Sequence, residues 1–254
     1  MRIFATLTTI FAILIFAVSC NKESSQIDQL PRYVIKYNNY SRSGDTIKLE
    51  YSGNRVVKLI HNTYTTFYQY DKSGLPVSTS YTREGSEEMP QQRFTYQNGK
   101  LVKTAVISTD QETGIESESI TMEFVHYGDT MVSMEYNDDL HGPRYLEEWH
   151  FNGSGNIYKS LKYYFHPDQS SMMDPATTYY EYDNSPHPAS HVHENQVLNI
   201  WNSNNVIRQD RYDPEGESTN LLEFRYIYDE KDFPLVKILD HDTIEKYVYE
   251  AMPG

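Results

Sequence analysis

The densest group of metal-binding residue types is a histidine-rich segment in the last third of the chain. The segment contains His187, His191 and His193, and Glu194 comes directly after His193. If His191 and His193 lay on one strand they would point to the same face, and His187 or Glu194 would supply a third ligand of the kind that zinc takes. No cysteine or second histidine cluster has a spacing that completes such a site. A polar loop after a hairpin is the favoured interpretation, so the sequence predicts neither a metal site nor a cofactor.

Two groups of acidic residues raise the question of catalysis. Asp240, Asp242 and Glu245 lack the glycine and the ligand spacing of a calcium loop, which favours a solvated hairpin turn. Glu147 and Glu148 are adjacent, so in a strand they would point to opposite faces and could not flank one glycosidic bond. The sequence contains neither a Gly-x-Ser-x-Gly elbow nor a His-Glu-x-x-His motif. We therefore expect no enzymatic activity and assign no catalytic residue.

The two tryptophans, Trp149 and Trp201, are the residues we expect to contact a ligand if the protein binds one. Trp201 is surrounded by asparagine and serine in the segment 199–205. An exposed tryptophan can stack on a sugar ring while neighbouring amides bind its hydroxyl groups. Core packing is nevertheless the favoured interpretation of Trp201, because tryptophan is also a common core residue. Which of these two roles each tryptophan has depends on the strand or loop that carries it.

One pattern recurs along the chain and predicts those elements. An aromatic residue, any residue and a second aromatic residue come before a turn rich in Gly, Asn or Asp, and an apolar segment follows. Copies occupy residues 49–57, 68–77, 94–102, 149–157, 180–184 and 226–236. Asn98-Gly99 lies between two such segments, which is the strongest short-range signal for a hairpin. Because the spacing between copies varies, we predict an antiparallel meander and not a strict solenoid.

The same pattern predicts that one face of the sheet is aromatic. Residues i and i+2 of a strand share a face, which pairs Tyr68 with Tyr70 and Phe94 with Tyr96, while the residues between them are mostly polar. A sheet of many strands cannot stay flat, and no helical periodicity after residue 20 supplies a cover for the aromatic face. We therefore predict an all-β fold, an antiparallel meander of about 14–16 strands that is strongly curved into a barrel-like or half-barrel sheet around that face. Charged residues in the strand centres argue against a barrel that faces lipid.

The first residues have the features of an exported lipoprotein. Arg2 precedes an apolar run, which predicts a signal peptide at residues 1–19. Cys20 is the only cysteine of the 254 residues and follows Ala-Val-Ser, which resembles the lipobox of bacterial lipoproteins and implies acylation of this cysteine. A free exported thiol is the alternative, although it would be unusual in an oxidising compartment. Residues 20–30 are then the lipidated cysteine with a flexible tether, and residues 31–254 form a single all-β domain.

The charge of the chain excludes one class of partner. The formal net charge is −14, and the mean hydropathy is −0.68. An acidic protein is repelled by a phosphate backbone, so we expect no nucleic-acid partner.

Several of these features together resemble a group of Bacteroidetes lipoproteins of unknown function that have a porin-like, strongly curved β-sheet. The resemblance rests on the leader, on the Tyr-x-Tyr-Asp units, and on segments 179–188, 202–209 and 226–238, with Asp183, Pro188, Asn204-Asn205 and Pro234 at matching positions. Asp232-Phe233 departs from the pattern, because a Gly-aromatic pair is usual there. The resemblance implies a fold and an outer-membrane location, and it carries no catalytic or binding residues. The units are also similar to the YD repeats of bacterial toxin shells through shared hairpin chemistry.

These observations lead to one expected function and one alternative. We expect a surface lipoprotein that is anchored in the outer membrane through Cys20 and binds a glycan or a small apolar molecule without enzymatic chemistry. Lys22-Glu23 loosely resembles an export signal of surface lipoproteins, which favours an outward-facing location. The alternative is a structural or protein-partner-binding element of the cell envelope, with the partner unknown. A cavity of several hundred Å³ would favour the ligand, and a filled interior would favour the alternative.

Overall fold

The computed structural model describes residues 29–37, 44–53, 55–83, 89–110, 112–138, 142–166, 171–187, 202–240 and 242–251. These residues form sixteen β-strands: β1 (Gln29–Tyr37), β2 (Gly44–Ser52), β3 (Arg55–Ile60), β4 (Tyr64–Tyr70), β5 (Pro76–Arg83), β6 (Met89–Gln97), β7 (Lys100–Thr109), β8 (Glu116–Tyr127), β9 (Met131–Asp138), β10 (Gly142–Phe151), β11 (Ile157–Tyr164), β12 (Ala176–Pro186), β13 (Asn204–Tyr212), β14 (Ser218–Tyr228), β15 (Pro234–Leu239) and β16 (Asp242–Ala251). Within these ranges no helix is long and apolar enough to cross a membrane.

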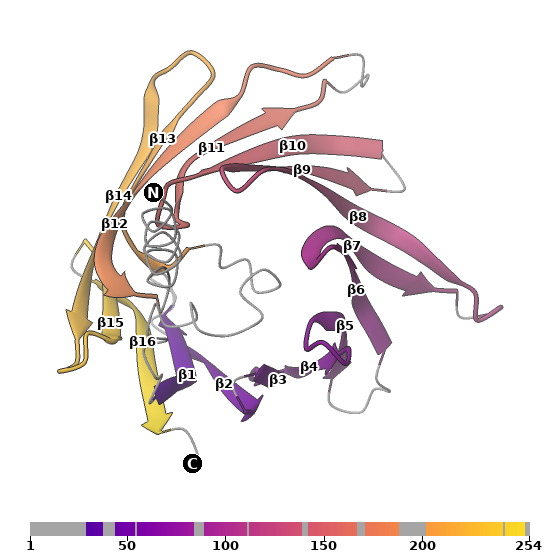
Figure 1. Ribbon diagram of the computed structural model, residues 1–254, viewed down its shortest axis with the longest axis horizontal. Coiled ribbons are helices and arrows are strands. Elements are labelled where there is room, and N and C mark those ends of the chain that lie inside the picture. Colours follow the sequence, from indigo (N-terminus) through magenta and orange to yellow (C-terminus); the bar gives the residue numbers. More distant parts are fainter. Residues whose placement is uncertain are drawn as a thin grey trace, which may run out of the picture.

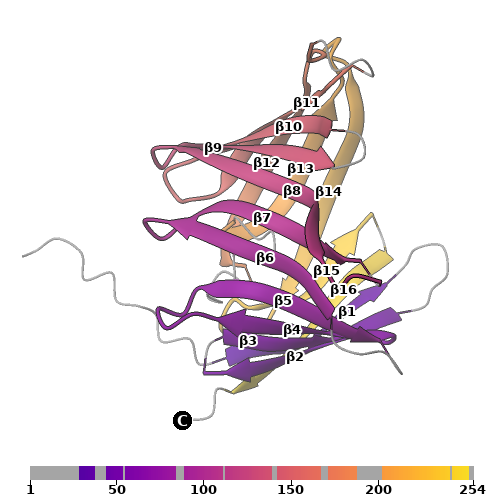
Figure 2. The same cartoon turned by 90° about the vertical axis from the view of Figure 1, so that its right-hand side faces the viewer.

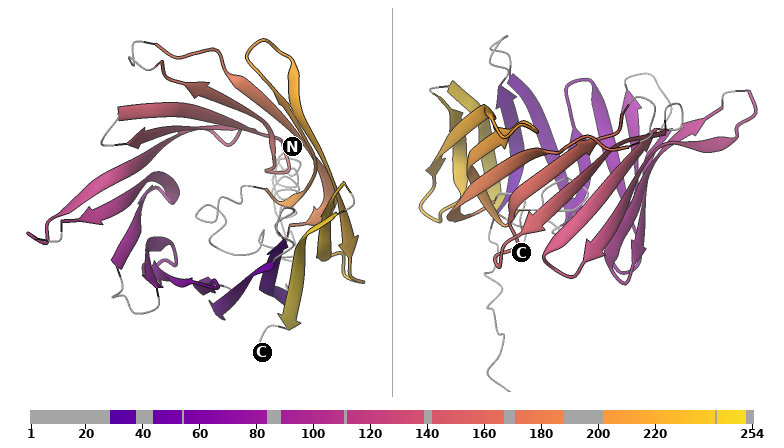
Figure 3. Two further views of the ribbon diagram at one scale, coloured as in Figure 1. Left: turned by 180° about the vertical axis from the view of Figure 1, so that it is seen from behind. Right: turned by 90° about the horizontal axis from the view of Figure 1, so that it is seen from above.

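The strands form a closed antiparallel barrel. Each strand pairs with its neighbours in the chain, and β1 pairs with β16 to close the ring. Figure 1 shows the ring of strands, Figure 2 shows successive strands from β2 to β11 lying side by side, and Figure 3 shows the ring from behind and from above. The predicted all-β antiparallel meander is confirmed, and the sheet closes completely instead of stopping at a half-barrel. Gln29 and Leu30, in the stretch interpreted as tether, belong to β1.

The pairing of the strands places the predicted aromatic residues on one face. Phe94 pairs with Thr104, and Thr104 pairs with Met122. Met122 pairs with Tyr136, which pairs in turn with Tyr145. Directly paired residues share a face of the sheet. Followed around the ring, the same face carries Tyr51, Tyr68, Tyr70, Phe94, Tyr96, Phe124, Tyr136, Tyr145, Trp149, Phe151, Tyr180, Tyr182, Phe224, Tyr226, Tyr228, Tyr247 and Tyr249.

This aromatic face lines the inside of the barrel. Along β8, Phe124 is 8% exposed, whereas the next residue, Val125, is 51% exposed. In a closed single-layer sheet, side chains converge on the concave side and spread apart on the convex side, so the shielded face is the inner one. The core therefore lies on the inner wall. One cluster contains Leu30, Leu49 and Val56, and a second contains Phe94, Leu101, Phe124, Val132 and Met134 with Trp149 and Phe151 packed against it.

The outer face carries ion pairs in the middle of the strands. Lys48 Nζ lies 2.9 Å from a Glu50 oxygen, and Lys103 Nζ lies 2.6 Å from a Glu118 oxygen. Both pairs lie on the face opposite the aromatic rings. Such charges are costly against hydrocarbon.

A second structural feature repeats at one end of the barrel. This is the end where the odd-numbered strands begin, and it is called the bulge end. Most hairpins there contain a β-bulge, and a side chain from the next strand binds the carbonyl of a bulge residue. The hydroxyl of Tyr70 donates to Val56 O, and that of Tyr182 donates to Ile157 O at 2.6 Å. The same contact joins Tyr51 to Pro31 O, Tyr226 to Val206 O and Tyr249 to Pro234 O, and the Nε2 atom of His126 to Leu101 O. The repeated tyrosine therefore closes the sheet at its bulges, which is a structural role.

The turns that follow the tyrosines repeat one hydrogen-bond pattern. Asp71 Oδ1 accepts from the backbone N–H of Ser73 at 2.8 Å and of Leu75 at 2.9 Å, and Gly74 has a positive φ of 89°. Asp229 Oδ1 accepts in the same way from residues 231 and 233. The Tyr-Asp unit at residues 68–77 is thus a turn, as predicted, and Pro76 lies at the bulge of the returning strand.

Asp232 occupies the position that Gly74 has in the repeated turn, with a positive φ of 63°. A residue with a Cβ is strained in this region, whereas glycine is not, although glycine also gains entropy in the unfolded chain. We expect Asp232→Gly to raise the free energy of unfolding by about 0.5 kcal/mol in urea titrations.

Gly74→Ala is the reverse substitution at the equivalent position of the other turn, because it adds a Cβ where Asp232→Gly removes one. An added Cβ would lie 2.0 Å from the Arg55 guanidinium and would keep the unfavourable φ, so we expect a loss of about 1 kcal/mol or more. A destabilised Asp232→Gly protein would contradict the equivalence of the two turns.

Candidate functional site

A hollow of about 550 Å³ lies at the end of the barrel opposite the bulge end, here called the far end. It is formed where the connection between β11 and β12 approaches the turn between β13 and β14. Its lining consists of Tyr164, Met173, Asp174, Ala176, Arg211, Asp213, Pro214, Thr219 and Asn220. The volume is within the range of about 300–1,000 Å³ that is typical of small-molecule sites.

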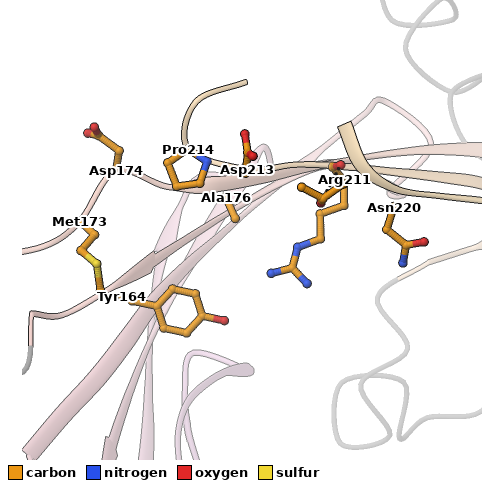
Figure 4. A pocket seen from close by; sticks show the side chains of 9 residues that line it. Tyr164, Met173, Asp174, Ala176, Arg211, Asp213, Pro214 and Asn220 are labelled. Atoms are coloured by element: carbon orange, nitrogen blue, oxygen red, sulfur yellow. Dashed lines mark hydrogen bonds between the residues drawn. The ribbon is translucent and has the colours of Figure 1, made fainter. Parts of the chain in front are cut away.

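Three polar side chains are placed in the hollow by the inner face of the sheet. Arg211 pairs with Thr178 on β12 and with Asn220 on β14, and Tyr164 is the last residue of β11. Figure 4 shows the Tyr164 ring, the Arg211 guanidinium and the Asn220 amide pointing to the same side. A hydroxyl, a guanidinium and an amide are thereby presented together, next to the face of an aromatic ring.

The two carboxylates of the lining, those of Asp174 and Asp213, do not point toward Arg211. Figure 4 shows the Asp174 and Asp213 side chains turned away from the side to which the Arg211 guanidinium points. Asp213 Oδ1 accepts the backbone N–H of Glu217 at 2.8 Å, so it stabilises the β13–β14 turn. The part of the hollow that faces the barrel interior therefore has more hydrogen-bond donors than acceptors.

The inner wall below the hollow is polar. Burial raises the pKa of Tyr180, and its hydroxyl lies 3.4 Å from Ser160 Oγ. The Lys162 ammonium lies 3.7 Å from the centre of the Tyr145 ring and 5.4 Å from that of Tyr164, which is a cation–π geometry. This wall therefore presents tyrosine hydroxyls and the Lys162 side chain next to the hollow.

A buried polar network at the bulge end has a structural role. Asn205 is 0% exposed, and its Nδ2 atom lies 3.2 Å from Ser185 O and 3.3 Å from Pro186 O and from an Asp183 oxygen. The hydroxyl of Tyr228 donates to the Asp183 carboxylate. Burial, followed by the hydrogen bond to Asp183, raises the pKa of Tyr228. The network ties β12, β13 and β14 together at residues 183–187 and 202–205.

A second part of this network joins β11 to the start of β13. Asn156 Nδ2 donates to Asn204 Oδ1 at 2.9 Å, and Asn156 Oδ1 accepts the backbone N–H of Ser203 at 2.7 Å. The Asp183 and Asn204-Asn205 positions on which the sequence resemblance rests are therefore the ones that hold the strand ends in place.

His187 makes the stability of this region depend on pH. Burial, together with the nearby Lys237 ammonium, lowers the pKa of His187 to about 4. In the unfolded chain the imidazole has a pKa of about 6.5, so below pH 6.5 the unfolded state binds a proton that the folded state does not. Above pH 6.5 the imidazole is neutral in both states and does not make the stability depend on pH. As the pH falls from 6.5 to 4, the free energy of unfolding decreases by about 1 kcal/mol per pH unit.

His187→Asn, which cannot titrate, provides the comparison. We expect urea titrations at pH 7.5, 6, 5 and 4.5 to show a steeper loss of stability for the native chain than for this variant. Equal slopes for the two proteins would contradict the lowered pKa.

Some of the residues singled out from the sequence lie within the described ranges. Trp149 lies on the inner face of β10, its ring is 6.3 Å from that of Phe124 between centres, and its Nε1 atom donates to Glu147 at 3.0 Å. It is not part of the lining of the hollow. Glu147 and Glu148 lie on opposite faces, as predicted. Asp240 lies in the turn between β15 and β16, with a φ of 56°.

Other residues singled out from the sequence are outside the described ranges: Cys20, His191, His193, Glu194 and Trp201. Among the residues that the structure does describe, no group of three or more His, Cys, Asp or Glu side chains is placed to hold a metal ion.

The residues of the hollow were missed by sequence reasoning. Tyr164, Arg211 and Asn220 belong to no motif, and they are brought together by strand pairing. The only local signal is the turn that begins at Asp213-Pro214, which marks the position of a strand end.

No protein-family model matches the sequence. No curated protein matches it either. The structure is similar to that of a porin-like protein from Bacteroides vulgatus, with a TM-score of 0.60 and 14% identity over 88% of this chain and 99% of that chain. A porin-like protein from Bacteroides uniformis matches with a TM-score of 0.39 and 10% identity over 82% of this chain and 78% of that chain. The first of these shows that the porin-like fold expected from the sequence resemblance is present.

Proposed function

We propose that this protein is a surface lipoprotein, anchored in the outer membrane through Cys20, that binds a glycan in the hollow at the far end of the barrel. No chemical step is involved. The observation that carries the proposal is the hollow itself, about 550 Å³ in volume, in which an aromatic ring, a guanidinium and an amide lie together. A concave site with a few convergent polar groups is the usual form of a ligand site.

The composition of the lining favours a sugar over a small apolar molecule. A sugar ring has apolar faces that pack on an aromatic side chain and a rim of hydroxyl groups that need hydrogen-bond partners. Tyr164 offers the ring, and Arg211 and Asn220 offer the partners. An apolar ligand would leave the guanidinium without water and without a partner, which is costly.

The direction of β1 supports a hollow that lies away from an anchor at Cys20. β1 begins at the bulge end with Gln29, where it pairs with Ala251 of β16. Eight residues separate Cys20 from β1, and they span at most roughly 30 Å when extended. Tyr164 and Arg211 lie at the opposite ends of the strands, which supports a hollow that is open to the outside and not to the anchoring membrane.

The outer face of the barrel supports attachment by a lipid instead of insertion of the sheet. Arg208 is 3.6 Å from Glu181 and 3.4 Å from Asp210 on the outer face, and Arg93 pairs with Glu116. An arginine or lysine on the lipid side of a spanning barrel costs roughly 2–4 kcal/mol at the bilayer centre.

The anchor is tested by metabolic labelling with an acyl-chain probe. The native chain should be labelled and found in the outer-membrane fraction, whereas Cys20→Ala should be unlabelled and released without detergent. An unlabelled native chain, or a Cys20→Ala protein that needs detergent to leave the membrane, would overturn this part of the proposal.

Glycan binding is tested with a glycan array followed by calorimetry on the mature protein. Tyr164→Ala should weaken binding by about tenfold, because it removes the stacking surface. Tyr179→Ala is the matched control, since Tyr179 is an exposed tyrosine on the outer face of β12. If no glycan binds and an envelope protein co-purifies instead, the structural or partner-binding alternative is the better one.

A further inference from the structure

Several cations on the outer face of the barrel are paired with carboxylates. Lys48, Lys103 and Arg208 each have a carboxylate oxygen within 4 Å. This matching is expected for a chain with an excess of acidic residues, whose formal net charge is −14.

The two cations on the inner face next to the hollow, Arg211 and Lys162, are not paired in this way. Within the described part of the chain, no carboxylate lies within ion-pair distance of the Arg211 guanidinium or the Lys162 ammonium. Lys162 pairs with Ala176 of the hollow lining and rests on the Tyr145 ring. Glu147, its partner on β10, accepts a hydrogen bond from the Trp149 indole.

The acidic residues of the lining do not neutralise Arg211 either. Asp213 holds its own turn through the bond to Glu217, and Asp174 is turned away. Positive charge is thus concentrated on the side of the hollow where the Tyr164 ring and the Asn220 amide are also presented. A guanidinium binds a carboxylate or a phosphate through two parallel hydrogen bonds, which gives both strength and orientation.

We infer that the ligand of the hollow is an anionic sugar whose acidic group pairs with Arg211, an inference that rests on the proposed glycan-binding function. The sugar ring packs on Tyr164, and hydroxyl groups bind Asn220. Lys162 adds long-range attraction from the inner wall. A neutral sugar would leave Arg211 without a counter-charge.

Calorimetry with three probes tests the inference on the mature protein: a uronic-acid trisaccharide, a neutral glucose trisaccharide, and a sugar phosphate. We expect at least one of the two acidic probes to bind about tenfold or more tightly than the neutral one. The two acidic probes distinguish a carboxylate ligand from a phosphorylated one.

Variants of one arginine on each face supply the control. Arg211→Gln should remove the preference for the acidic probe, because it should weaken the acidic probe about tenfold more than the neutral one, and Arg211→Lys should retain part of the preference. Arg225→Gln, on the exposed outer face of the neighbouring strand β14, should change neither. Equal thermal unfolding of all variants shows that the fold is intact.

The outcomes separate this inference from the proposed function. Equal affinity for neutral and acidic probes, or an acidic preference that persists in Arg211→Gln, overturns the inference and leaves glycan binding intact. Failure of every probe and every arrayed glycan to bind overturns both.

Discussion

Asn205→Ala is expected to lower the free energy of unfolding by about 3–5 kcal/mol. Asn205 is fully buried, and its amide donates toward Ser185 O, Pro186 O and the Asp183 carboxylate. Alanine would remove the Asn205 amide donor from all three acceptors, although Ser185 O keeps the Asn204 amide and the Asp183 carboxylate keeps the Tyr228 hydroxyl, and it would also leave a void. The loss combines several contributions, which is why it exceeds that of one exposed hydrogen bond.

Urea titration monitored by tryptophan fluorescence measures this effect. Asn184→Ala is the matched control, because Asn184 is exposed on β12 beside Asp183, and its change should stay within about 0.5 kcal/mol. If the two variants are equally stable, the network is not what holds the ends of β12 and β13.

Phe124→Ala is expected to cost about 3–5 kcal/mol, whereas Val125→Ala should cost about 0.5 kcal/mol or less. The two residues are adjacent on β8 but lie on opposite faces, with Phe124 in the inner cluster beside Trp149 and Val125 half exposed. Removing the inner ring opens a cavity against Met134 and Leu101, and removing the outer methyl groups opens none.

This pair of variants also tests the orientation of the wall. If the aromatic face were outside, Phe124→Ala would be tolerated in aqueous buffer and Val125→Ala would be the damaging change. Equilibrium unfolding of both proteins in buffer without detergent distinguishes the two arrangements.

Features that depend on neighbouring residues could be predicted from the sequence. Asn98 and Gly99 both have positive φ angles, 51° and 74°, between β6 and β7, as an Asn-Gly hairpin requires. Asp71 forms its turn through its own side chain and the next four residues. The alternation of rings and polar residues assigns faces because the period of a strand is two. These are local signals, and they were sufficient for the strands, the turns and the aromatic wall.

The carbonyl partners of the tyrosines were not predictable in the same way. Tyr70 and Val56 lie on different hairpins, as do Tyr182 and Ile157. Their contacts depend on where a bulge shifts the register, and a one-residue shift leaves little trace in the sequence pattern.

By itself, the sequence determined that the chain folds as an all-β meander with an aromatic face and turns rich in Gly, Asn and Asp, because each of these follows from the chemistry of a few adjacent residues. Only the tertiary structure decided that the sheet closes, which requires Gln29 to meet Ala251, and that Tyr164, Arg211 and Asn220 share one hollow. The physical reason is that twist and bulges accumulate over sixteen strands. Their sum sets the closure and the facing strand ends, and no single segment encodes that sum.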